Sequence, residues 1–150
     1  MSSLELLLPA GDFEKMQYAF AFGADAVYLG IPRYSLRARE NGFKKKEQVF
    51  EAIEYAHQRG KKVYVTANIL PHNHKVQPFE NYVDEFLQNC QPDAWIMSDP
   101  GMIMHMREQH PEQEIHLSVQ ANTVNYATAK FWEKNGIKRI ILSRELSIKK

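Results

Sequence analysis

The residues with the clearest chemical potential lie in the segment Ile115–Asn122, which reads IHLSVQAN. Its odd positions are apolar and its even positions are polar, a two-residue period that predicts a β-strand with two chemically different faces. A buried amide without a hydrogen-bond partner costs about 1–3 kcal/mol, so burial of Gln120 and Asn122 makes sense where a substrate completes their bonds. The pattern predicts either an antiparallel strand with one face in water or a barrel strand whose polar face binds substrate.

A second group of chemically active residues forms a loop between residues 30 and 46, GIPRYSLRARENGFKKK, named the basic loop below. Its single acid is Glu40, and its basic residues are Arg33, Arg37, Arg39, Lys44, Lys45 and Lys46. Tyr34 and Phe43 lie between these cations. Arginine side chains beside aromatic rings suit phosphate groups and unstacked bases. The loop is therefore a candidate RNA-binding segment, and the alternative is a solvated basic loop without a partner.

Histidine and cysteine residues indicate neither a metal site nor a nucleophile. His72 and His74, in PHNHK, resemble metal ligands, but no third ligand stands at a diagnostic spacing and the HExxH motif is absent from the sequence. We therefore expect no metal site here and a solvated histidine pair. Surface or packing roles are predicted for three histidines in helical segments, His57, His105 and His110. The only cysteine, Cys90, predicts a structural thiol and excludes an internal disulfide.

Apolar runs and helix signals alternate along the chain, and these elements must position the polar residues. Six segments are predicted to be strands: 4–8, 26–29, 62–67, 94–97, 115–122 and 139–142. Five segments are predicted to be helices: 13–22, 46–59, 79–89, 100–110 and 126–135. Residues 68–77 are predicted to be a polar loop, and residues 143–150 to begin a sixth helix.

This alternation of strands and helices predicts an α/β fold with parallel strands. A six-stranded doubly wound sheet would need a glycine-rich phosphate fingerprint in its first turn, whereas LLLPAGDFEK holds one glycine. A (β/α)8 barrel usually needs about 250 residues. We therefore expect residues 1–150 to form a single incomplete barrel domain, the N-terminal part of a TIM-type (β/α)8 barrel with about six parallel strands and five helices.

Composition places the chain among ordinary globular proteins. It has 44% hydrophobic and 25% charged residues with a formal net charge of +1, so any polyanion-binding signal must be local. No apolar run approaches the roughly 20 residues that span a bilayer, and the N-terminal segment lacks the basic and apolar regions of a signal peptide. We expect a cytoplasmic protein without membrane contact.

The informative polar residues follow the predicted strands, at the edge where barrels and open α/β sheets place their sites. They are Gly11, Tyr34–Arg39, Asn68, Ser98, Asp99, Gln120, Asn122 and Ser143–Glu145. The alternative for Asp12 and Asp99, and for Asn122, is that they cap helices. No GxSxG motif and no recognisable Cys–His spacing is present in the sequence, so nucleophilic hydrolysis gains no support.

Several segments in register give the chain a family resemblance. They are ELLLPAGDFEKMQYAFAFGADAVYLG, PRYSLRAR, WIMSDPGMIM, IHLSVQANTVNYATAKFW and IILSRELS. Together they resemble the collagenase-like peptidase U-32 family over essentially the whole chain. Within that family they are most similar to the branch that takes part in prephenate-dependent 5-hydroxylation of the wobble uridine of tRNA.

The resemblance implies a longer parent protein whose barrel continues beyond Lys150 and whose iron–sulfur cluster is bound by cysteines outside this chain, because Cys90 matches none of them. It implies tRNA as a partner and prephenate as a co-substrate. The candidate site residues that it carries over are Tyr34, Ser35, Arg37, Asn68, Ser98, Asp99, Gln120, Asn122, Ser143, Arg144 and Glu145. Arg37 and Arg144 are expected to be anion clamps.

Two other functions stay open at this point. One is a peptidase acting on collagen-like or other peptides, and the other is a non-catalytic fragment that only binds or scaffolds. Under each function we expect the isolated chain to be inactive, because barrel and cluster are incomplete. We also expect self-association through the open sheet edges.

Overall fold

One curved parallel sheet organises the molecule, in which the computed structural model describes residues 4–148. Its strands are β1 (Leu7–Pro9), β2 (Ala26–Gly30), β3 (Lys62–Thr66), β4 (Ala94–Met97), β5 (Ile115–Leu117) and β6 (Arg139–Ile140). They lie side by side in chain order, so β1 and β6 are the edge strands. All five neighbouring pairs are parallel.

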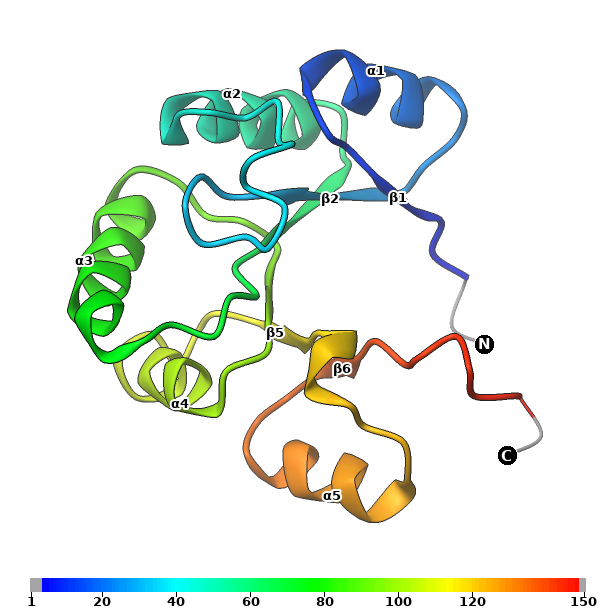
Figure 1. Ribbon diagram of the computed structural model, residues 1–150. Coiled ribbons are helices and arrows are strands. Elements are labelled where there is room, and N and C mark those ends of the chain that lie inside the picture. Colours follow the sequence, from blue (N-terminus) through cyan, green and yellow to red (C-terminus); the bar gives the residue numbers. More distant parts are fainter. Residues whose placement is uncertain (1–3, 149–150) are drawn as a thin grey trace.

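Five helices surround the outer side of this sheet, as Figure 1 shows. They are α1 (Phe13–Ala21), α2 (Lys46–His57), α3 (Asn73–Asn89), α4 (Pro100–Gln109) and α5 (Tyr126–Lys134). Each helix connects two neighbouring parallel strands, as in a regular (β/α) barrel. The structure thus confirms the prediction of a partial TIM-type barrel. None of the helices in residues 4–148 is long and apolar enough to cross a membrane.

The two faces of the strands differ in chemistry because successive side chains point to opposite sides. The outward side chains of β3 and β4, including Val63, Val65 and Trp95, are fully buried beneath the helices. The inward side chains form a second, smaller apolar cluster of Ala26, Tyr64, Ala94 and Ile96. Small residues alternate with large ones in that cluster, which suits the narrow interior of a barrel.

Aspartate and asparagine caps fix where three of the helices begin. Asp12 Oδ1 accepts a hydrogen bond from the Lys15 amide at 2.8 Å, and Asp99 Oδ1 accepts one from the Met102 amide at 2.9 Å. These geometries confirm the capping alternative for both aspartates. At α5 the cap is Asn125, whereas Asn122 lies ahead of the helix with a left-handed backbone (φ 53°). Asn122 therefore does not cap α5; it is the C-cap residue of the 3₁₀ turn Val119–Ala121, and its amide donates to the Val119 carbonyl.

The predicted strand 115–122 is only partly correct. Strand β5 ends at Leu117, and residues Val119–Ala121 form a 3₁₀ turn. The reason is that both neighbours end at the same level, since Leu117 is in register with Met97 on β4 and with Ile140 on β6. A strand without hydrogen-bonding neighbours has nothing to keep it extended.

Other boundaries also differ from the prediction. Strand β1 spans Leu7–Pro9 and not 4–8, and β6 ends at Ile140 and not at 142. Helix α3 begins at Asn73, so residues 73–77 of the predicted loop are helical and Pro78 lies inside the helix. Residues Ser143–Leu146 form a turn, closed by a bond of 3.2 Å from the Leu146 amide to the Ser143 carbonyl, and no sixth helix begins within the described part of the chain. The last two residues of that predicted helix, 149 and 150, lie outside the described residues.

A polar network lies in the interior at the amino ends of the strands. The Tyr64 hydroxyl donates to Glu5 Oε2 at 2.7 Å, and Arg139 on the edge strand β6 donates to Glu5 Oε1 at 2.7 Å. Burial raises the pKa of the Glu5 carboxyl, but the bonds from Tyr64 and Arg139 outweigh it and leave that pKa below its ordinary value. The network joins the first strand segment to the last across the barrel interior.

Candidate functional site

The basic loop is packed against the barrel and is not a freely solvated segment. Tyr34 is 6% exposed. Its ring meets Phe79 at 5.2 Å and Tyr82 at 5.0 Å, both on α3. Burial raises the pKa of the Tyr34 phenol, against a lowering effect from Arg33. This tyrosine therefore anchors the loop as a neutral aromatic group, and its predicted role in contacting substrate is not supported by its position.

Asparagine and glycine complete the anchoring of the loop. The Asn41 side chain donates to the Gly30 carbonyl at the end of β2 and accepts a bond of 3.1 Å from the Phe43 amide. The Gly42 amide donates to the Gly11 carbonyl, in the turn after β1, at 2.8 Å. These bonds attach the loop to the carboxyl ends of two adjacent strands.

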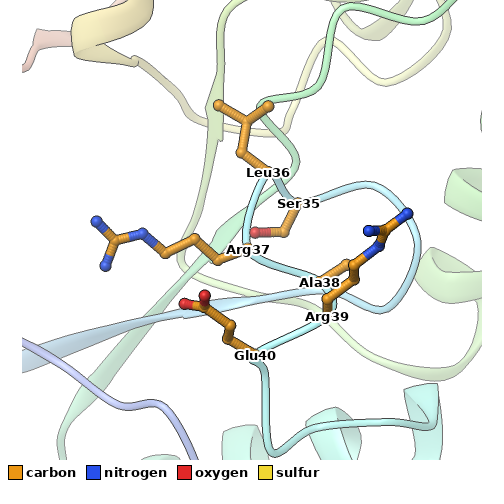
Figure 2. A pocket seen from close by; sticks show the side chains of 6 residues that line it. All are labelled: Ser35, Leu36, Arg37, Ala38, Arg39 and Glu40. Atoms are coloured by element: carbon orange, nitrogen blue, oxygen red, sulfur yellow. The ribbon is translucent and has the colours of Figure 1, made fainter.

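Anchoring leaves the arginines of the loop facing solvent. Arg37 and Arg39 line a shallow hollow of about 680 Å³ made by residues 35–40, which Figure 2 shows together with Glu40. Neither arginine, nor Arg33, forms an ion pair with any residue between 4 and 148. A guanidinium without an internal partner is free to bind an external phosphate or carboxylate. These three side chains are therefore anion-binding candidates among residues 4–148.

The lysines of the loop differ in this respect. Lys44 Nζ donates to the Arg39 carbonyl at 3.0 Å, and Lys46 pairs with Glu85 on α3. Both amides ahead of α2, those of Lys44 and Lys45, donate to the Gln48 side chain at 2.8 and 3.0 Å. Lys44 and Lys46 therefore hold the loop to itself and to α3, and only part of the predicted cationic set is available to a ligand.

A chain of side-chain hydrogen bonds links the basic loop to two strand ends. Asn68, which follows β3, accepts a bond of 3.1 Å from the Leu36 amide in the loop. Its own Nδ2 donates to Gln120 Oε1 at 3.0 Å, and the Ser118 hydroxyl donates to the same oxygen. Asn68 and Ser118 are buried, whereas Gln120 is exposed. Three predicted site segments thus meet at the carboxyl end of the barrel.

Three buried hydroxyl groups at or after the strand ends have no hydrogen-bond partner within residues 4–148. Thr66 Oγ1 at the end of β3, Ser98 Oγ after β4 and Thr123 Oγ1 after β5 are all buried, and none has a hydrogen-bond partner within residues 4–148. Buried hydroxyls are normally satisfied, and the strand-end location is where barrel ligands bind. Thr66 and Thr123 were absent from the predicted set, and strand-end position was the signal that could have found them.

The remaining predicted residues take no part in the hydrogen bonds among Asn68, Gln120 and Ser118. Asn122 is exposed and makes no side-chain hydrogen bond within the described chain. Ser143 and Glu145 bond to each other in the turn after β6, and Arg144 is exposed there. Asp99 uses one oxygen for its capping bond. Ser35 is buried, and its side chain packs against Gly30. A Cβ added at Gly30 would stand 2.6 Å from the Ser35 hydroxyl oxygen.

The sequence was compared with protein families and with known proteins. Residues 11–150 match the model of peptidase family U32. The chain is 57% identical to tRNA hydroxylation protein P of Escherichia coli over 144 residues, which are 96% of this chain and 31% of that protein. It is 56% identical to tRNA hydroxylation protein P of Haemophilus influenzae, with the same coverage of 96% and 31%. The chain thus spans about a third of the length of these relatives.

Among solved structures, the U32 peptidase Mk0906 superimposes with a TM-score of 0.77 at 11% sequence identity, covering 95% of this chain and 60% of the other. At such an identity the likeness shows the fold alone. The match of the family model over nearly the whole chain and the sequence relatives agree with one another. The chain belongs to peptidase family U32.

Proposed function

We propose that this chain is the N-terminal barrel portion of an enzyme that hydroxylates RNA, with the wobble uridine of tRNA as its target. The observation that carries the proposal is the anchored basic loop, which presents Arg33, Arg37 and Arg39 without internal partners at the carboxyl end of the barrel. Relatives at 56–57% identity are named tRNA hydroxylation proteins, which supports the same substrate class.

The loop and the strand ends suit different parts of an RNA substrate. Arginine forks bind backbone phosphates, and because Asn68 and Tyr34 hold the backbone of the loop, that backbone loses little conformational freedom on binding. The side chains of Asn68, Gln120 and Ser118, with the unpartnered hydroxyl of Ser98, offer donors and acceptors to the edge of an unstacked base. In this division the loop supplies most of the affinity for the RNA backbone, and the strand ends recognise the base.

Prephenate, the proposed co-substrate, carries carboxylate groups that need cationic partners. Arg144, exposed in the turn after β6, and Arg37 in the basic loop are the proposed clamps. They follow different strands, so a small dicarboxylate could be held between segments of the same barrel edge. Individual catalytic roles are not assigned to either arginine.

An iron–sulfur cluster does not fit the residues of this chain. Such clusters need about four cysteine ligands, whereas the sequence holds only Cys90. That thiol follows α3, and burial raises its pKa, which disfavours the thiolate that metals bind. We propose that any iron–sulfur cluster of the whole protein uses ligands outside these 150 residues.

We also expect the whole protein to act in the cytoplasm.

The proposal is tested in cells lacking the complete protein and any redundant pathway, by mass spectrometry of wobble-uridine hydroxylation. The wild-type gene should restore the modification, and the double variant Arg37→Ala/Arg39→Ala should restore it only weakly. The matched control is Lys134→Ala/Lys138→Ala, which removes the same charge from exposed positions at and beyond the end of α5. Unchanged hydroxylation in the deletion strain would refute the function.

Peptidase activity is the second candidate, because the family to which the chain belongs is named for peptidases. Against it, no serine in residues 4–148 hydrogen-bonds a histidine, so the serine–histidine pair of a serine hydrolase is not formed there. Cleavage of a defined peptide by the complete, highly purified and chelator-treated protein would favour this candidate over the RNA enzyme.

Binding without chemistry is distinguished by measuring tRNA affinity of the chain at several salt concentrations. The arginine double variant should bind more weakly and lower the slope of log K against log salt by about 0.9 for each lost phosphate contact in a duplex region, or about 0.7 in a single-stranded one. Normal binding by this variant would show that the basic loop does not contact RNA.

A further inference from the structure

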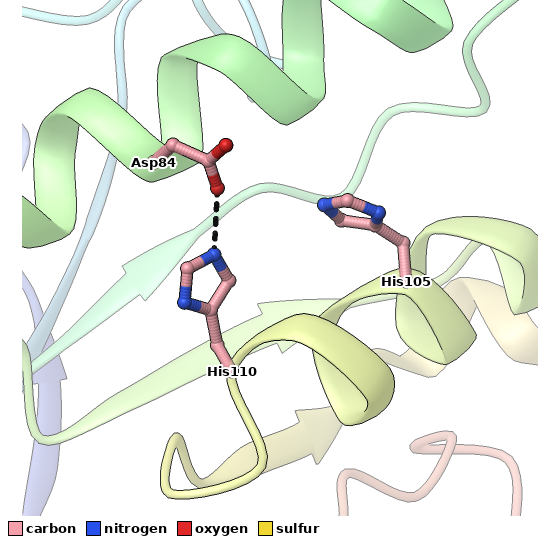
Figure 3. A group of neighbouring side chains, drawn as sticks. All are labelled: Asp84, His105 and His110. Carbon is pink, nitrogen blue, oxygen red and sulfur yellow. Dashed lines mark hydrogen bonds and ion pairs between the residues drawn. The ribbon is translucent and has the colours of Figure 1, made fainter.

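A group of metal-ligating side chains lies between α3 and α4, away from the strand ends. Asp84 belongs to α3, His105 to α4, and His110 follows α4 directly. Figure 3 shows the three side chains pointing toward one another across the gap between the two helices. One ligand atom from each lies within 4.8 Å of the other two. His110 Nε2 is 2.7 Å from Asp84 Oδ1.

A fourth residue orients one of these histidines. Glu80 precedes Asp84 by one turn of α3, and its Oε1 is 3.2 Å from His105 Nδ1. The tautomer that carries its proton on Nδ1, the nitrogen that pairs with this carboxylate, has the ring lone pair on Nε2. That Nε2 atom is buried and has no hydrogen-bond partner within the described residues. A carboxylate behind a histidine whose other nitrogen is free is the usual arrangement of a metal-binding imidazole.

We propose that Asp84, His105 and His110 bind a divalent transition-metal ion, with zinc as the best match, and that Glu80 positions His105 for it. Two imidazole nitrogens and one carboxylate oxygen form a donor set that Zn²⁺ commonly takes in proteins, with metal–ligand distances of about 2.0–2.2 Å. Tetrahedral ligands at these distances lie about 3.3 Å apart. Small side-chain rotations bring the three ligand atoms from their present spread to that spacing.

Access and location suit a small hydrated ion. Asp84 and His110 also line an open hollow of about 410 Å³, together with Glu112, so solvent reaches the cluster from one side. A water molecule from this side would complete the coordination. Since the ligands join two neighbouring outer helices, the metal would act as a clamp between α3 and α4 and not as part of the strand-end site.

Simple ion pairing is the competing explanation. The pairs His110–Asp84 and His105–Glu80 could join the helices without a metal. That arrangement leaves the buried Nε2 of His105 without a hydrogen-bond partner, which proteins usually avoid. A metal ligated at Nε2 satisfies it, and this difference favours the metal site.

The test is calorimetric titration of the chelator-treated chain with Zn²⁺, with Co²⁺ absorption spectra as a report of tetrahedral nitrogen and oxygen coordination. The wild-type chain should bind one equivalent of Zn²⁺. The variant His105→Ala should lose this binding. Glu80→Gln should weaken binding by about 10–100-fold, the effect of losing an orienting partner. Equal binding by wild type and His105→Ala would overturn the proposal.

The control is His74→Ala, because His72 and His74 are exposed and their rings stack at 6.2 Å. If this variant loses the ion and His105→Ala keeps it, the ion binds at the exposed pair and the proposal is wrong. Asp84→Asn serves as a second test variant should His105→Ala unfold by circular dichroism. Its side chain is 51% exposed, so the fold should tolerate the change, and retained binding would also contradict the proposal.

Discussion

Asn68 is the residue on which the geometry of the candidate site depends most directly. Its side-chain oxygen Oδ1 accepts a hydrogen bond from the Leu36 amide in the basic loop. Its side-chain nitrogen Nδ2 donates to Gln120 in the turn after β5. We expect Asn68→Ala to lower the free energy of unfolding by about 1–3 kcal/mol, because buried polar groups lose their partners. Urea titration measures the change.

The matched control for that prediction is Asn68→Asp. A carboxylate keeps an acceptor for the Leu36 amide but cannot donate to Gln120 Oε1. This variant should keep the loop protected from trypsin at Arg37 and Arg39, whereas Asn68→Ala should expose both sites. Equal proteolysis of the two variants would show that the Leu36 bond does not hold the loop.

His116 gives the stability a dependence on pH. Burial lowers the pKa of its imidazole, against a raising effect from Glu114, whose Oε1 is 2.6 Å from Nε2. An unfolded chain titrates its histidines near pH 6.5. Between that value and the lowered folded pKa the unfolded state binds more protons, so stability is lost as pH falls through this window. We expect the free energy of unfolding to decrease below about pH 6.5.

His116→Phe should remove the decrease and keep the edge-to-face ring contact with Tyr64, which lies at 4.7 Å between centroids. Denaturant titrations over a pH series measure both proteins. His72→Phe, at an exposed position, should follow the wild-type profile. An unchanged slope in His116→Phe would assign the effect to other groups.

At this scale the sequence predicted part of the geometry of the candidate site. The strand-end rule identified Asn68, Ser98 and Gln120, since the carboxyl ends of parallel strands share one edge. Tyr34 could not be recognised as an anchor, because its partners Phe79 and Tyr82 are distant in the chain. The histidine cluster was missed because its members come from two helices and show no local ligand spacing.

The contact of Gly42 in the basic loop with Gly11 and Asp12 in the first β–α turn, called the seam below, is sensitive to side-chain size. A Cβ added at Gly42 would stand 2.5 Å from Asp12 Cβ and 2.7 Å from the Gly11 carbonyl oxygen. We expect Gly42→Ala to cost about 1–3 kcal/mol of stability through overpacking, measured by urea unfolding.

Gly11→Ala is the control on the other side of the same seam. There an added Cβ would meet only the Lys15 side chain at 3.6 Å, an ordinary contact. This variant should stay within about 0.5 kcal/mol of the wild type. A similar loss in both variants would mean that the turn, and not the seam, resists substitution.

Element boundaries were predictable where burial and local pattern agreed. The fully buried AWIM segment is β4 as expected, with all four residues inaccessible. Helix α3 departs from expectation because Val76, Phe79 and Val83 pack against the core and outweigh the backbone bond that Pro78 removes. Strand β5 departs because its length is set by its neighbours, which no pattern within 115–122 encodes.

At the scale of the whole molecule, the β/α repetition and the missing glycine fingerprint were sufficient to predict a partial barrel. The cross-barrel bonds from Glu5 to Tyr64 and Arg139 were not predictable, because they join residues 59 and 134 positions apart. Such contacts depend on sheet curvature, which arises only when all the strands are assembled.

The open edges of the sheet lead to a prediction about assembly. Strands β1 and β6 each have one hydrogen-bonded neighbour in the described chain, and unpaired strand edges favour pairing with another chain. We expect the 150-residue chain to sediment with a weight-average mass that rises with concentration. A clean monomer at all concentrations would contradict this prediction.

The strict neighbour order of the strands also has a consequence for synthesis of the chain. Each strand pairs with the strand completed just before it, so the sheet can grow one β–α unit at a time as the polypeptide leaves the ribosome. The bond between Glu5 and Arg139 spans 134 positions and cannot close before β6 has been made. Newly made amino-terminal units would therefore wait with an exposed interior until β6 emerges, and that interval is when a chaperone would be most useful.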